Sequence, residues 1–185
     1  MAEKRNTKRT KLLLDEWGFP LNNSASSSVG YKKMLRQFFN RLSLLLNRSK
    51  MRFWTAKVDR IVSQPPGTNE GFTQADIDLS RKVTFGQMST WEIVCEEVLD
   101  TAHPHAYYER ALSELNRRGI CDAEYQKMRH FAWLTVGWLN FEKMVWEWQR
   151  FDKQDIDRAI ERQFSEGWIS KANRDRWREF ADRYA

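Results

Sequence analysis

The stretch "FAWLTVGWLNFEKMVWEW", residues 131–148, decides the fold, because aromatic rings occupy a third of its positions. Its apolar residues recur at alternating spacings of three and four, which is the pattern of a helix packed against other helices: Phe131, Leu134, Trp138, Phe141, Val145 and Trp148. A ligand pocket and a membrane span are the alternatives. Area burial favours core packing over the pocket, and the charged residues from Glu142 onward exclude a span. We therefore expect a central helix over residues 123–150.

The composition favours helices over a β architecture. Four prolines and eight glycines leave long stretches without a helix breaker. We therefore expect an all-α protein, an irregular bundle of αα-hairpins around the central helix. Cys95 and Cys121 have neither CxxC spacing nor the density of a disulfide framework. They predict reduced thiols in an intracellular, cytoplasmic protein (nuclear in a eukaryote), with no signal peptide and no transmembrane segment.

The charge is unevenly distributed along the chain. Residues 1–62 carry 14 Lys and Arg against 4 Asp and Glu, whereas the remainder carries 17 against 21. This asymmetry predicts a basic element that meets an anionic surface, attached to a more acidic body. We expect residues 1–30 to form a flexible basic tail, a short apolar peptide and a serine-rich linker. Residues 31–185 then form a single helical domain, with a basic helical segment at 31–63 and a helical body at 72–185.

Nucleic acid is the partner that the basic segment predicts. Its cations alternate with aromatic residues, and cations along a helix neutralise phosphates and release counterions. No motif for reading bases is present, so the expected contact is to the phosphate backbone. An ordinary amphipathic helix and a helix on an anionic membrane surface are the alternatives. The candidate nucleic-acid-binding residues are Lys4, Arg5, Lys8, Arg9, Lys11, Lys32, Lys33, Arg36, Arg41, Arg48, Lys50, Arg52, Lys57 and Arg60.

Two apolar patterns follow each other in the same segment. The first comprises Leu35, Phe38, Leu42 and Leu45, and the second, out of phase with it, comprises Met51, Trp54, Val58 and Ile61. The phase change predicts a kink or break at "NRSK", residues 47–50.

A protein–protein adaptor is the alternative function. Either the apolar peptide at residues 12–19 or the helical hairpins could engage another chain or a second copy, and the peptide could instead pack on its own domain. Trp133 and Trp146 lie off the main pattern of the central helix, so they would dock a partner if exposed. The candidate partner-docking residues are therefore Leu13, Trp17, Phe19, Trp133 and Trp146.

Enzymatic chemistry has the weakest support in the sequence. His103, His105, Cys121 and His130 match no standard zinc spacing. The acids Glu92, Glu96, Glu97 and Asp100 form a ridge at helical spacing, which we interpret as a solvated face or as a docking face for the protein's own basic segment. Phosphate-cradling glycine loops and nucleophile motifs are absent from the sequence. We expect a non-enzymatic binding or assembly protein with no catalytic residue, metal or cofactor, and rank a metal-dependent enzyme last.

A weak internal repeat joins two predicted hairpins at an offset of 48 residues. In each copy a helix ends at a glycine, Gly119 or Gly167, followed by two apolar residues and a polar cap, Asp122 or Ser170. The two copies could result from duplication of one hairpin or from independent use of a common hairpin, and the sequence leaves both possibilities open. The first copy, "LSELNRRGICDAEYQKMR", resembles the short helical hairpin called SHOCT, with Cys121 and Asp122 where Ile and Thr are usual. That resemblance implies a small interaction element.

Overall fold

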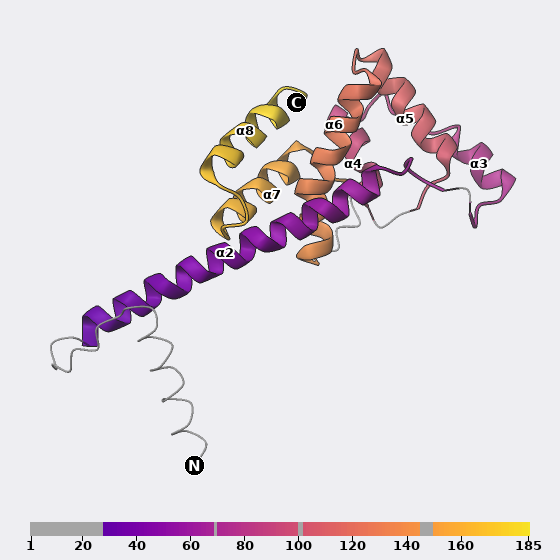
Figure 1. Ribbon diagram of the computed structural model, residues 1–185. Helices are drawn as coiled ribbons and strands as arrows, with labels where there is room; N and C mark the ends of the chain where they lie inside the picture. The colour runs from indigo at the N-terminus through magenta and orange to yellow at the C-terminus, as the bar shows by residue number, and fades with distance from the viewer. Residues whose placement is uncertain (1–27, 69, 100–101, 145–149) are drawn as a thin grey trace. The chain divides into compact units, whose positions relative to one another are not determined.

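The computed structural model describes residues 28–68, 70–99, 102–144 and 150–185, with side chains from residue 33 onward (Figure 1). In these ranges all of the regular secondary structure is helical, which confirms the predicted all-α fold. None of the described helices has the length and apolar character that crossing a bilayer requires. The elements are α2 (Ser28–Val62), α3 (Gln74–Ser80), α4 (Thr90–Cys95), the 3-10 helix η2 (Glu96–Val98), α5 (His105–Arg117), α6 (Asp122–Ala132), the π-helix η3 (Trp133–Glu142), α7 (Lys153–Ser165) and α8 (Lys171–Asp182).

Helix α2 is continuous, so the predicted break at residues 47–50 is wrong. The segment contains no proline or glycine, and Asn47, a poor helix former, donates its side-chain amide to the Glu166 carbonyl at 2.6 Å. Contacts divide the chain into two units, residues 1–42 and 43–185, and α2 passes through both. Within the second unit, α2 packs through Trp54 and Val58, which are buried.

The aromatic stretch forms the centre of the second unit. α6 continues directly into η3, and every residue from 131 to 140 is buried. The central helix ends at Glu142 rather than at the predicted residue 150. Met144 has a φ of 50°, a left-handed conformation that a continuing α-helix excludes. Residues 145–149, and with them Val145, Trp146 and Trp148, lie outside the described residues.

Side-chain donors from α2 and α7 meet the carbonyl groups at the start of η3. Trp54 donates its indole N–H to the Trp133 carbonyl at 3.2 Å, and Gln163 donates its amide to the Leu134 carbonyl at 2.8 Å. A change from α to π hydrogen bonding removes carbonyl groups from the regular ladder, and buried carbonyl groups need a partner. The two donors meet that need and fix α2 and α7 to the central helix.

Tryptophan contacts at both ends of the stretch confirm that it belongs to the core. Trp138 packs edge-on against Trp168, with 5.2 Å between ring centroids. The Lys143 ammonium lies over both rings, 5.1 and 5.5 Å from their centroids, and pairs with Glu166. These contacts hold the end of the central helix against the α7–α8 hairpin.

The two hairpins end their first helices in the same way. Gly119 and Gly167 have φ values of 84° and 76°, and the following residue's N–H bonds back to the helix, Ile120 to Leu115 at 3.0 Å and Trp168 to Gln163 at 2.8 Å. The return helices then differ, because Cys121 is the N-cap of α6 whereas Ser170 caps α8. The predicted cap at Asp122 is therefore wrong by one residue, and the constant offset fails after the glycine.

Replacing each of these glycines by alanine tests the packing of α2. Both substitutions strain the left-handed backbone by about 1 kcal/mol. A Cβ at Gly119 meets nothing, whereas a Cβ at Gly167 collides with the Leu44 side chain of α2. We expect Gly167→Ala to lower the free energy of unfolding more than Gly119→Ala in urea denaturation. Equal losses would contradict the contact between Leu44 and Gly167.

A buried arginine joins three elements of the second unit. The Arg129 side chain on α6 is 2% exposed and binds both carboxylate oxygens of Glu97 on η2, one of them at 2.6 Å. Its Nη1 also donates to the Val62 carbonyl at the end of α2, at 2.9 Å. Burying a guanidinium requires such compensation, because an unpaired charge in the interior costs several kcal/mol.

Substitution of Arg129 tests this arrangement. We expect Arg129→Met to lower the free energy of unfolding by about 3–5 kcal/mol, because Glu97 keeps a buried charge without a partner. Arg117→Met is the matched control, since Arg117 pairs with Glu114 at the surface, and we expect it to cost less than about 1 kcal/mol. The free energies of unfolding are measured by urea denaturation. Similar losses of stability in the two variants would contradict the proposed role of the Arg129–Glu97 pair.

Candidate functional site

The cations of α2 form the candidate interface, because all those described are exposed and free of ion pairs. They are Lys33, Arg36, Arg41, Arg48, Lys50, Arg52, Lys57 and Arg60, and no ion pair joins them to another described residue. Lys57 lies 5.0 Å from the Trp54 ring, and the acid nearest in sequence, Asp59, pairs with His130 at 2.9 Å. Lys4, Arg5, Lys8, Arg9 and Lys11, and the side chain of Lys32, lie outside the described residues.

Cations elsewhere in the described chain are mostly paired with acids. Eleven of them form ion pairs: Arg81, Arg117, Arg118, Arg129, Lys143, Arg150, Lys153, Arg158, Arg162, Arg174 and Arg178. The contrast with α2 follows from the sequence, since residues 17–58 contain no Asp or Glu. The positive charge of α2 is therefore uncompensated along the helix.

Apolar side chains are exposed on α2 between these cations, and we call them the α2 stripe. Each residue turns the helix by about 100°, so residues three and four apart share a side. Phe38, Leu42 and Leu45 of the first predicted apolar pattern are 43%, 41% and 61% exposed, so that pattern is largely unburied, and Phe53 further along the helix is 78% exposed. The second pattern packs on the body through Trp54 and Val58. The α2 stripe comprises Met34, Leu35, Phe38, Phe39, Leu42, Leu45, Leu46 and Phe53.

Five of the eight described cations of α2 lie along the borders of the α2 stripe. By helical spacing, Arg41, Arg48 and Arg52 follow one border, and Lys50 and Lys57 follow the other. Arg48 and Arg52 also line a groove of about 420 Å³ beside Ser170, where α8 begins. The positive end of the α8 dipole adds to the cationic character of this groove.

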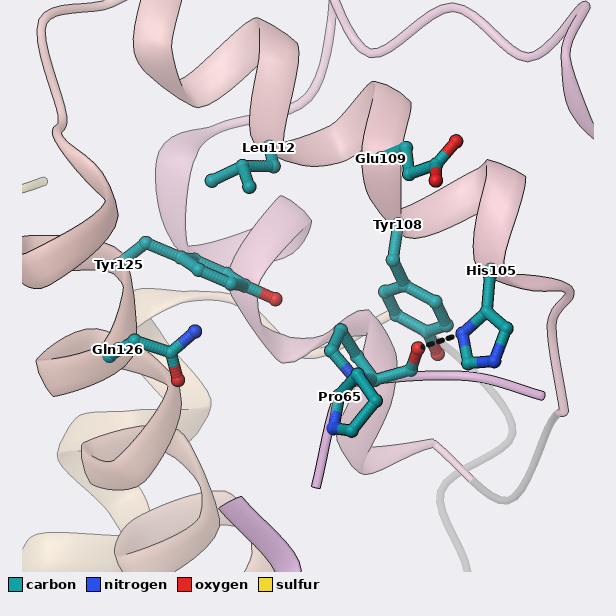
Figure 2. A pocket seen from close by; sticks show the side chains of 8 residues that line it. Pro65, His105, Tyr108, Glu109, Leu112, Tyr125 and Gln126 are labelled. Atoms are coloured by element: carbon teal, nitrogen blue, oxygen red, sulfur yellow. Dashed lines mark hydrogen bonds between the residues drawn. The ribbon is translucent and has the colours of Figure 1, made fainter. Parts of the chain in front are cut away.

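A separate pocket of about 430 Å³ lies between α5, α6 and the loop after α2 (Figure 2). Tyr108 comes from α5 and Tyr125 from α6, and both line the pocket together with Pro65 and Pro66. Burial raises the pKa of both phenols well above their ordinary value. They remain protonated near neutral pH and can donate hydrogen bonds, but they supply no base.

His105 fixes the loop at one side of this pocket. Its Nδ1 donates to the Pro66 carbonyl at 2.8 Å, shown as the dashed line in Figure 2. Glu109 and Gln126 lie at the pocket's exposed rim. No sequence motif predicts the pocket, because its members come from three segments that only the fold brings together.

Glu96 is buried and Glu97 is partly buried, so the interpretation as a solvated face is wrong for these two acids. Glu96 is 5% exposed and accepts a hydrogen bond from the Tyr107 hydroxyl at 2.9 Å. The Arg150 guanidinium lies 3.3 Å from its other oxygen without the alignment of a hydrogen bond. Glu97 binds Arg129, and Glu92 accepts from the Ser89 N–H at the start of α4. Asp100 lies outside the described residues.

The histidines and the cysteine of the hypothetical zinc set have separate surroundings. His103 lies 3.7 Å from Glu96, His105 bonds to Pro66, His130 pairs with Asp59, and Cys121 caps α6. Among the described residues, no group of three His, Cys, Asp or Glu is placed to hold a metal ion. The structure thus brings none of these four residues to a common site.

Of the candidate docking residues, only Trp133 lies among the described residues. Its side chain is 8% exposed and stacks on Phe141, with 5.5 Å between ring centroids. The exposure on which its docking role depends is therefore absent. Leu13, Trp17, Phe19 and Trp146 lie outside the described residues.

The buried His103 predicts a pH dependence of stability. Its ring stacks on Tyr107 at 4.1 Å, and burial lowers the pKa of His103 below 6.5, although Glu96 opposes the shift. The unfolded chain therefore takes up this proton first as the pH falls. The stabilising contribution is complete above pH 6.5 and is lost as the pH falls through the folded pKa.

Urea denaturation at about pH 7.5 and about pH 5.5 tests the predicted loss of stability at the lower pH. We expect the wild type to lose stability at the lower pH, and His103→Phe, which keeps the stacked ring but cannot titrate, to lose less. Equal losses in the two proteins would exclude His103 as the titrating group.

Comparison with protein-family models, with curated proteins and with solved structures finds no match. The function is therefore argued from the charge, burial and contacts of the described residues.

Proposed function

We propose that the protein is a non-enzymatic binding protein in which α2 attaches the helical body to an anionic partner. The observation that carries the proposal is the contrast in ion pairing: the described cations of α2 are exposed and unpaired, whereas eleven cations elsewhere in the described chain are paired. An anionic partner supplies the charge that the helix itself lacks.

The spacing of the cations adds a physical reason. Arg48 and Arg52 are four residues apart. Like charges at this spacing destabilise a helix by about 0.2–0.5 kcal/mol per pair. A partner that carries negative charge removes this repulsion and gains from counterion release.

The phosphate backbone of a nucleic acid is the anionic partner that the sequence predicts, and the predicted contact remains a proposal. Exposed cations along a helix support contact to phosphates without base reading. Cations on both borders of an apolar stripe, however, go beyond what phosphate contact requires. The adaptor alternative rests on residues 12–19, which lie outside the described residues, or on the hairpins α5–α6 and α7–α8.

Binding of the full chain to polyanions tests the proposal. We expect it to bind duplex DNA, single-stranded RNA or anionic vesicles at low salt and to lose affinity as NaCl is added. We expect a triple variant to bind about 10- to 100-fold more weakly; it combines Arg48→Gln, Lys50→Gln and Arg52→Gln. Fluorescence anisotropy and vesicle sedimentation measure these effects.

A matched triple variant controls for net charge. Arg81, Arg117 and Arg158 are exposed and already paired with acids three residues away. Changing all three to glutamine removes the same total charge, and we expect a smaller effect than in the α2 variant. Equal effects, or no binding to any polyanion at low salt, would contradict the proposed function.

A further inference from the structure

The α2 stripe exposes large apolar side chains on a single helix. Seven of its eight members are exposed, and Leu35 is half-buried. From Met34 to Phe53 the stripe extends over about 28 Å at the rise of an α-helix. Exposed apolar surfaces of this length are typical of binding sites for apolar partners. We therefore expect the α2 stripe to contact an apolar partner.

The stripe is distinct from the side of α2 that belongs to the core. Within residues 43–62, Leu44 lies against Gly167, Asn47 bonds to Glu166, and Trp54 is buried. Leu45 and Phe53 lie on the other side of the same helical turns and are exposed. The body is therefore already packed against α2, and the stripe is not part of that contact.

The charge around the stripe has one sign. Arg41, Arg48 and Arg52 follow one border and Lys50 and Lys57 the other, and residues 17–58 contain no acid. Long cationic side chains on the borders of an apolar strip can extend to anionic headgroups while the strip enters the acyl region. A stripe bordered by cations on both sides is typical of a helix that lies in a membrane interface.

Other occupants fit this surface less well. A second copy would bring cation-rich borders together, and residues 17–58 offer no acid to pair with them. A nucleic acid can stack bases on Phe38, Phe39 and Phe53, but it leaves the aliphatic members of the stripe in water. An anionic bilayer accommodates both kinds of side chain, because headgroups meet the cations and acyl chains meet the stripe.

We propose that the anionic partner of α2 is the surface of a phospholipid bilayer with anionic headgroups, in whose interface α2 lies with the α2 stripe inserted. This inference rests on the proposed function, since it names the anionic partner. The helix lies along the interface and does not cross it.

Sedimentation of the full chain with vesicles tests the inference. The vesicles contain phosphatidylcholine alone or with about a third phosphatidylglycerol. We expect binding to the anionic vesicles to be at least about tenfold tighter than to the neutral ones. Leu42→Gln with Leu45→Gln should weaken binding to the anionic vesicles by about tenfold, because two leucines leave the acyl region. Both positions are exposed, so the fold, checked by circular dichroism, is retained.

Leu79→Gln with Met144→Gln is the matched control. Leu79 and Met144 are 65% and 62% exposed and lie outside α2, so we expect their replacement to leave vesicle binding unchanged. A loss in this control as large as that in the stripe variant would overturn the assignment to α2. Vesicle binding that survives Leu42→Gln with Leu45→Gln would overturn the role of the stripe.

The remaining outcomes separate this inference from the proposed function. Salt-sensitive binding to DNA or RNA without vesicle binding overturns the bilayer and leaves an anionic partner. A dimer that dissociates on Leu42→Gln with Leu45→Gln, seen by light scattering without vesicle binding, overturns the bilayer in favour of a second copy. Absence of binding to vesicles and to nucleic acids at low salt overturns both proposals.

Discussion

The buried guanidinium of Arg129 is the constraint on which the arrangement of the second unit depends. It satisfies Glu97 on η2 and the last carbonyl of α2 from a single position on α6. Neither partner can move without leaving a buried polar group unpaired, and such groups cost more than an ordinary hydrogen bond contributes. Through this residue the end of α2 is held against the central helix. Trp54 adds a second hydrogen bond between the two helices, from its indole N–H to the Trp133 carbonyl.

Local patterns predicted the parts of the fold that depend on neighbours in sequence. The cap at Ser170 and the glycine ends of α5 and α7 follow from two or three residues each. The spacing of apolar residues likewise predicted that residues 131–141 pack in the core. The end of the central helix at Glu142 was not predictable in this way, because periodicity continues beyond the point where the backbone turns.

Glu96, which is buried, and Glu97, which is partly buried, show why charged sites are harder to predict than helices. Both acids have the spacing of a solvated ridge, and nothing near them in sequence identifies their partners. Tyr107 follows Glu96 after a loop, and Arg129 lies a helix further on. Only the fold brings these donors to the carboxylates, and without them burial of either acid would be prohibitive. The pocket in Figure 2 escaped prediction for the same reason.

The continuous α2 changes the meaning of its two apolar patterns. Patterns that are out of phase indicate either a break between two helices or one helix with two apolar sides. Because residues 31–62 contain no proline or glycine, the second possibility costs no backbone hydrogen bond, and the structure adopts it. One side supplies Trp54 and Val58 to the core, while Leu45 and Phe53 remain exposed on the other. Because different residues serve the two sides, the exposed pattern is free of the packing constraints that fix the buried one. Its retention of large apolar side chains therefore points to binding rather than to folding.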